Sequence, residues 1–146
     1  MRQVACSRAT ERTVDSAALD LALAFAEEAQ RHFPDSYVFL FGSHAKGTAR
    51  PSSDIDVAVI VDGIEGYEED PWLGIMAKRL LHGISEESFY PVEGHLFQAD
   101  HSQSGIINNI LETGIQLLGP YGSLENQFVT YGLPGDEPVC RLMQPA

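Results

Sequence analysis

The spacing of apolar residues alternates along the chain between a helical period and a strand period. Apolar side chains three and four positions apart over 14–33 predict an amphipathic helix, which Thr13 or Asp15 could cap and Pro34 ends. Shorter patterns predict strands over 36–41, 54–61 and 89–98, a short helix over 42–46, and helices over 71–81 and from 104 to 111 or beyond. The second long helix is expected to end before Gly83 and to turn inward a stripe of Leu73, Met76, Ala77 and Leu80.

This order of elements predicts a chain of the α/β (α+β) class. Its 146 residues are enough for one domain with a real core but too few for two full-sized domains. We therefore expect a single domain over 1–146, with a core over about 14–118 and an irregular tail over 119–146. The tail contains several glycines and prolines and has no periodic pattern.

The chain is strongly acidic, with a formal net charge of -12 and a pI near 4.6. This charge argues against a nucleic-acid partner, because the phosphate backbone would be repelled unless a local basic groove compensated. The lysines and arginines are scattered and predict no such groove. An acidic surface suits an enzyme that uses a metal ion, and it suits docking onto a basic protein.

Cys6 and Cys140 lie near opposite ends of the chain, outside any C-x-x-C or zinc-ligand spacing. We interpret them as reduced thiols. The first residues lack the apolar region of a signal peptide, and no predicted helix is long and apolar enough to cross a bilayer. The expectation is a cytoplasmic protein without a membrane partner.

The segment Phe39–Asp62 carries the strongest chemical signal. One apolar run ends in Gly42-Ser43, and a second begins with Asp54-Ile55-Asp56. Two acids spaced by two at the start of a strand point to the same face and form a potential metal site. A Gly-Ser pair offers backbone N–H groups and a hydroxyl to an anionic phosphate if a helix begins there.

A Gly-Ser pair, ten residues and then D-x-D resembles the signature of the minimal nucleotidyltransferases, a branch of the DNA polymerase beta-like nucleotidyltransferase superfamily. The resemblance in element order extends to about Leu118. It implies a nucleotidyltransferase fold, with a small mixed β-sheet and helices packed on one side. It also implies that Gly42 and Ser43 bind a nucleoside triphosphate, that Asp54 and Asp56 hold divalent metal, and that a third carboxylate completes the site.

Three residues compete for the role of third carboxylate: Glu93, Asp100 and Asp62. Glu93 is favoured, because a glutamate among apolar neighbours in the middle of a strand is costly unless it faces a cation or the surface. It would bind a metal and accept the proton of the acceptor hydroxyl. The competing interpretation is an edge-strand glutamate in water. His95 falls on the same strand face, and here an ordinary surface histidine is the favoured interpretation.

The predicted catalytic and metal-binding set is therefore Asp54, Asp56 and Glu93. Mg²⁺ is the expected metal, because carboxylates and phosphate oxygens suit a hard octahedral ion. The predicted nucleotide-binding set is Gly42, Ser43 and Lys46, the last lying one helical turn after the serine. The expected donor is ATP.

The resulting hypothesis is a metal-dependent transfer of a nucleoside monophosphate, most simply AMP, to a hydroxyl group. Stand-alone domains of this size resemble the antitoxin partners of HEPN-type toxins, which implies a tyrosine of a partner protein as acceptor. Two alternatives stay open. One is a small-molecule nucleotidyltransferase that completes its acceptor pocket as a homo-oligomer, and the other is a non-catalytic module that neutralises a partner by contact alone.

Overall fold

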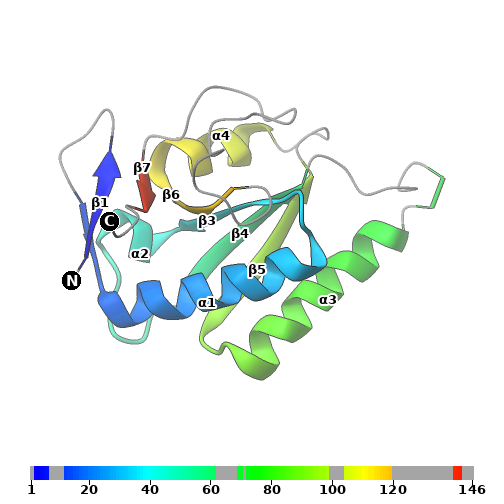
Figure 1. Cartoon of the computed structure of the whole chain (residues 1–146), viewed down its shortest axis with the longest axis horizontal. Helices are drawn as coiled ribbons and strands as arrows, with labels where there is room; N and C mark the ends of the chain where they lie inside the picture. Colours follow the sequence, from blue (N-terminus) through cyan, green and yellow to red (C-terminus); the bar gives the residue numbers. More distant parts are fainter. Residues whose placement is uncertain are drawn as a thin grey trace.

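The structure is a computed structural model that describes residues 2–6, 12–61, 69–70, 72–98, 104–119 and 140–142 (Figure 1). The elements in these ranges follow one another along the chain as β1 (Arg2–Cys6), β2 (Arg12–Val14), α1 (Ser16–His32), β3 (Tyr37–Phe41), α2 (Ser43–Lys46), β4 (Ile55–Val61), α3 (Trp72–Ser88), β5 (Val92–Gln98), α4 (Ser104–Thr113), β6 (Ile115–Leu118) and β7 (Cys140–Leu142).

The described strands form one sheet in the order β2-β1-β7-β6-β3-β4-β5. Strand β3 pairs antiparallel with both β4 and β6, whereas β4 pairs parallel with β5. A parallel pair needs a crossover connection, and α3 lies between β4 and β5 in the chain. The predicted α/β (α+β) class with a mixed sheet is confirmed.

The sheet carries a hydrophobic cluster on each face. Leu40 of β3 lies in the cluster that contains the buried residues of α1 and α3, whereas its neighbour Phe39 lies in a cluster with Ile107 and Ile110 of α4. Figure 1 shows α1 and α3 on one side of the sheet and α4 on the other. The expectation of helices on one side only is therefore wrong for α4, because β3 and β4 present apolar side chains to both faces.

Helix α1 follows its prediction closely. Asp15 is its N-cap, and the Asp15 carboxylate accepts a hydrogen bond of 2.9 Å from the Ala18 backbone N–H. The helix ends at His32, just before Pro34. Its buried face includes Phe25, which has no exposed surface and contacts Phe89 edge-on at a ring separation of 5.6 Å.

Helix α3 is longer than predicted. The pattern places its end near residue 81, but the helix continues through Gly83 to Ser88. A glycine inside a helix costs about 1 kcal/mol relative to alanine. Leu81 is fully buried and Ile84 packs against the same core, so tertiary packing on both sides of the glycine offsets that cost.

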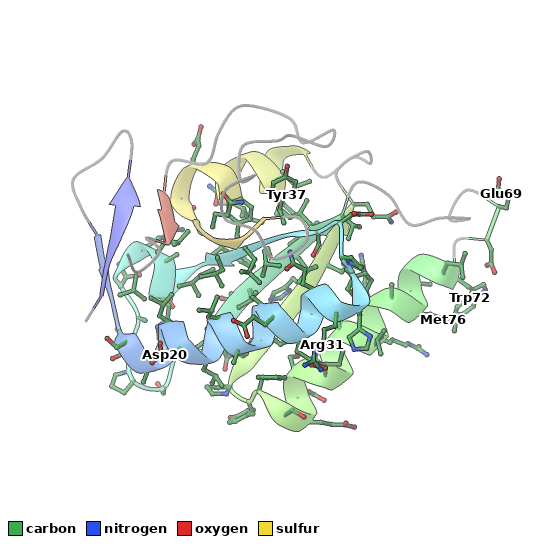
Figure 2. All side chains as sticks on the ribbon, viewed as in Figure 1. Asp20, Arg31, Tyr37, Glu69, Trp72 and Met76 are labelled. Atoms are coloured by element: carbon green, nitrogen blue, oxygen red, sulfur yellow. The ribbon has the colours of Figure 1, made fainter. Side chains whose placement is uncertain are left out.

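The inward face of helix α3 matches the prediction only in part, since Ala77 packs against the core as expected. Its buried residues include Gly74 and Leu81, while the predicted inward residues Met76 and Leu80 are exposed. Trp72 and Met76 lie near the helix end that is farthest from α2 (Figure 2). Both are 62% exposed, so α3 presents an apolar stripe to solvent that the core does not use.

The sequence pattern does not predict β1, β2, β6 or β7. Strand β6 is only four residues long, although all four are buried. Strand β7 lies at Cys140–Leu142, where the prediction of an irregular tail is wrong, and the other residues after 119 lie outside the described part. Short strands of this kind are ordered by pairing: Cys6 of β1 is the register partner of Cys140, although the two cysteines lie at opposite ends of the chain.

No helix in the part of the chain that the structure describes has the length and apolar character needed to span a bilayer.

Replacing Gly94 by alanine is expected to destabilise the fold. A Cβ at Gly94 would lie 2.5 Å from Phe25 Cζ and 3.1 Å from Leu81 Cγ, both in the packed core. We expect a loss of about 1–3 kcal/mol in the free energy of unfolding, the usual cost of overpacking a core. The measurement is urea unfolding followed by circular dichroism.

The matched control is Gly83→Ala, because a Cβ at Gly83 would meet nothing within 4 Å. This substitution removes the glycine penalty inside α3 and is expected to raise stability by about 0.5–1 kcal/mol. Equal effects of the two substitutions would contradict the packing of β5 against α1 and α3.

Candidate active site

Gly42 joins β3 to α2 and approaches a carboxylate closely. Its φ of 75° is in a region that side chains with a Cβ rarely adopt. A Cβ at Gly42 would lie 2.6 Å from Asp56 Oδ2, closer than real contacts allow. Two separate constraints therefore require glycine at this position: the backbone conformation and the neighbouring Asp56 carboxylate.

The loop from Gly47 to Asp54 is held by short-range hydrogen bonds. The Arg50 backbone N–H donates to Ser53 Oγ at 2.8 Å, and the Ser53 backbone N–H donates to the Arg50 carbonyl at 2.9 Å. His44 Nε2 lies 3.3 Å from the Ser53 carbonyl oxygen. These contacts fold the loop back so that the chain enters β4 beside the strand it has just left.

Asp56 and Glu93 come from neighbouring strands and stand opposite each other. The parallel register pairs Asp56 of β4 with Glu93 of β5, and paired residues of a sheet share a face. Together with His95 they form a cluster whose potential ligand atoms all lie within 4.8 Å of one another. The structure thus joins two acids that lie 37 residues apart in the sequence.

His95 is held beside both acids. Its Nε2 lies 3.3 Å from Asp56 Oδ1 and 3.9 Å from Glu93 Oε2. Its ring meets Phe41 edge-on at 5.4 Å and stacks on Phe97 at 6.4 Å. The favoured interpretation of His95 as an ordinary surface histidine therefore does not account for its contacts with the two acids. In the sequence, the feature that indicates this proximity is the position of His95 two residues after Glu93, on the same face of the predicted strand.

The other predicted residues occupy different positions. Asp54 precedes β4, is exposed, and is not a member of the cluster with Asp56 and Glu93. Ser43 begins α2 directly after Gly42, and Lys46 is exposed at the end of that helix.

Of the rival candidates for the third carboxylate, Asp62 and Asp100 lie outside the described residues.

The donor set of the cluster fits a divalent metal ion. Two carboxylates and one imidazole are common ligands of such ions. The side chains remain accessible, with 28% of Asp56, 48% of Glu93 and 40% of His95 exposed. Two carboxylates this close repel each other unless a cation lies nearby, which is a further reason why the arrangement suits a metal.

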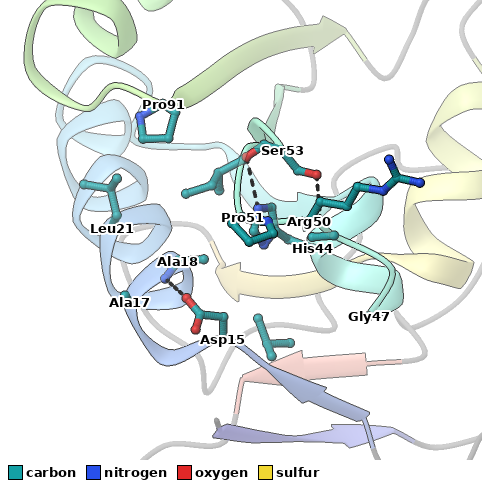
Figure 3. Close-up of a pocket in the computed structure, with 13 residues that line it drawn as sticks. Asp15, Ala17, Ala18, Leu21, His44, Gly47, Arg50, Pro51, Ser53 and Pro91 are labelled. Carbon is teal, nitrogen blue, oxygen red and sulfur yellow. Dashed lines mark hydrogen bonds between the residues drawn. The ribbon is translucent and has the colours of Figure 1, made fainter.

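A pocket of about 680 Å³ lies between the start of α1 and the loop that leads into β4 (Figure 3). Its lining includes Asp15, Leu21, Arg50 and Ile55 and does not include Asp56 or Glu93.

Ile55 belongs to the hydrophobic cluster of α1 and α3, whereas Asp56, the next residue, points to the opposite face. The pocket and the acidic cluster are therefore separate features.

Part of the chain matches a known family model. Residues 24–92 match the family model described as a nucleotidyltransferase domain. The matched region contains Gly42, Ser43, Asp54 and Asp56 and ends one residue before Glu93. The resemblance to nucleotidyltransferases is thus confirmed over this part of the chain. Among curated proteins the comparison finds no match.

Three solved structures are similar at low identity. A toxin–antitoxin complex with AMP-PNP is 21% identical with a TM-score of 0.49, over 71% of this chain and 76% of the other. A nucleotidyltransferase candidate from Sulfolobus solfataricus is 26% identical with a TM-score of 0.43, over 56% and 68%. A complex of the tri-AMPylated HEPN toxin of Shewanella oneidensis with its MNT antitoxin is 18% identical with a TM-score of 0.45, over 69% and 72%.

None of these superpositions is close.

Replacing Gly42 by alanine is expected to disrupt the cluster as well as the backbone. The new Cβ would displace the Asp56 carboxylate. We therefore expect metal affinity to fall by at least about tenfold, which is the smaller of the losses seen when a residue that orients a metal ligand is changed. Isothermal titration calorimetry with Mn²⁺ measures this affinity.

Gly47→Ala is the matched control, because Gly47 has a φ of 77° but its Cβ would meet nothing within 4 Å. It should cost about 1–2 kcal/mol of stability through backbone strain and leave metal affinity unchanged. Equal metal affinity in the two variants would show that Gly42 does not shape the site.

Proposed function

We propose that this chain is a metal-dependent nucleotidyltransferase that transfers a nucleoside monophosphate, most simply AMP from ATP, to a hydroxyl group of a partner protein. The observation that carries the proposal is the register of β4 and β5, which sets Asp56 beside Glu93. The Gly42 backbone lies against the same Asp56 carboxylate. A phosphate bound near Gly42 and Ser43 would therefore adjoin the acids.

The residues of the chain have distinct roles in this proposal. Gly42, Ser43 and Lys46 bind the triphosphate, while Asp56 and Glu93 hold a divalent cation, Mg²⁺ being the simplest candidate. Asp54 lies outside the acidic cluster, and we retain it as a metal ligand because of its place in the D-x-D motif. When bound, the metal offsets phosphate charge and favours attack on the α-phosphorus.

The reaction forms one bond and breaks one. The acceptor oxygen forms a bond to the α-phosphorus, and the bond from that phosphorus to the bridging oxygen breaks, so that pyrophosphate leaves. In this proposal Glu93 accepts the acceptor proton. Nearly half of its side chain is exposed beside Asp56, which supports this role by leaving the carboxylate accessible to an acceptor.

The chemistry of the chain favours a protein as the acceptor. The formal charge of -12 favours docking onto a basic partner and disfavours nucleic acid. Together with the resemblance to antitoxin domains, this supports a cytoplasmic antitoxin that modifies a HEPN-type toxin.

The pocket gives no support to the small-molecule alternative, because its lining does not include Asp56 or Glu93. The contact-only alternative has no need of the clustered acids.

Transfer should depend on Glu93. The full chain is incubated with ATP labelled at the α-phosphate, divalent metal and the product of the neighbouring gene, and labelled protein is counted. At saturating ATP and metal, Glu93→Gln should lower the rate by at least about a hundredfold, the scale of losing a positioned base.

The matched control for this variant is Glu87→Gln, an exposed glutamate on α3, which should transfer at the parent rate. Release of ADP in place of pyrophosphate would contradict nucleotidyl transfer. A large loss in Asp100→Asn with normal transfer by Glu93→Gln would assign the third carboxylate to Asp100.

We expect substitutions of Asp54 and Asp56 to have different effects on metal affinity. Without nucleotide, Asp56→Asn should weaken Mn²⁺ binding by at least about tenfold, whereas Asp54→Asn should change it by less than about threefold, because only Asp56 lies in the cluster. Calorimetry provides both values. A loss as large for Asp54→Asn would place Asp54 among the ligands of the same ion.

A further inference from the structure

We infer that His95 Nε2 is a third protein ligand of the metal held by Asp56 and Glu93, and that this nitrogen makes the site prefer a first-row transition ion such as Mn²⁺ over Mg²⁺. The inference rests on the proposed function, because it concerns the same metal site. It adds a ligand to the all-carboxylate set that the sequence motif implies, and it changes the expected metal.

The distances from His95 Nε2 to the two acids suit a common ion. Ligand atoms about 2.1 Å from an octahedral ion are about 3.0 Å apart when adjacent and about 4.2 Å apart when opposite. His95 Nε2 lies 3.3 Å from Asp56 Oδ1 and 3.9 Å from Glu93 Oε2. Both distances fall between these limits, and the ligand atoms of Asp56 and Glu93 lie within 4.8 Å of each other. One ion can therefore contact the nitrogen and both acids once the two carboxylates turn toward it.

The imidazole is oriented by its neighbours rather than by the acids alone. Phe41 meets the ring at 69° and Phe97 stacks on it at 18°. The register partner of His95 on β4 is Ala58, a small residue on the same face. The two aromatic contacts limit rotation of the ring and keep Nε2 directed at the carboxylates, as a preformed ligand requires.

The chemistry of the donor atom sets the choice of metal. Mg²⁺ prefers oxygen ligands and near-ideal octahedral geometry, whereas imidazole nitrogen is a good ligand of transition ions. A site of two carboxylates and one imidazole is therefore expected to favour Mn²⁺ over Mg²⁺ in binding affinity. A histidine that merely donates a hydrogen bond to Asp56 would bring no such preference.

The direct test is pulsed electron paramagnetic resonance of the full chain loaded with Mn²⁺ alone. A coordinated imidazole gives nitrogen modulation of the Mn²⁺ electron spin echo, which a purely oxygen-ligated ion does not show. We expect this modulation in the parent and in His82→Gln. We expect it to be absent in His95→Gln.

His82 is the matched control because its Nε2 also faces a carboxylate, lying 3.1 Å from Glu86 on α3. Calorimetry adds a second measurement. His95→Gln should weaken Mn²⁺ binding by at least about tenfold and Mg²⁺ binding by less than about threefold, so that the preference for Mn²⁺ falls.

The outcomes separate this inference from the proposed function. Mn²⁺ bound without nitrogen modulation in the parent, or with modulation that persists in His95→Gln, would overturn the ligand assignment of His95 while leaving nucleotidyl transfer intact. An equal loss of Mn²⁺ and Mg²⁺ affinity in His95→Gln would reduce His95 to a positioning residue and also overturn the inference. A parent that binds neither metal would overturn the metal site and the proposed function together.

Discussion

The parallel pairing of β4 with β5 is the constraint on which the site depends. Asp56 and Glu93 face each other only in this register, and a shift by one residue would turn one of them to the opposite face of the sheet. The register is fixed by burial, since β4 is buried on both faces after Asp56. The apolar core thus determines the position of two carboxylates that contribute little to the core themselves.

The residues packed around the cluster are small or aromatic. Gly42 leaves room for the Asp56 carboxylate, and Gly94, the neighbour of Glu93, lets Phe25 and Leu81 pack against the back of β5. His95 contacts the rings of Phe41 and Phe97 on the other face of that strand. One face of β5 therefore packs against α1 and α3, and the other carries Glu93 and His95 of the acidic cluster.

Much of this site could be predicted from the sequence because the Gly-Ser and D-x-D motifs are local. Adjacent residues are enough to predict Gly42 and Asp56 as candidate site residues, and the apolar strand neighbours of Glu93 are enough to predict that residue. The contact of His95 with Asp56 depends on strand register and is invisible to local pattern. The position of α4 on the second face and the pairing of β1 with β7 were missed for the same reason, since both depend on partners distant in sequence.

The central claim is that Asp56 and Glu93 share one metal ion. Its most direct test is a crystal structure of the full chain with Mn²⁺, with data collected at a wavelength where manganese scatters anomalously. The account predicts an anomalous peak within ligand distance of both carboxylates, about 2.0–2.3 Å from the nearest oxygen of each. A peak held by Asp54 without Glu93, or crystals that bind Mn²⁺ only elsewhere, would contradict it.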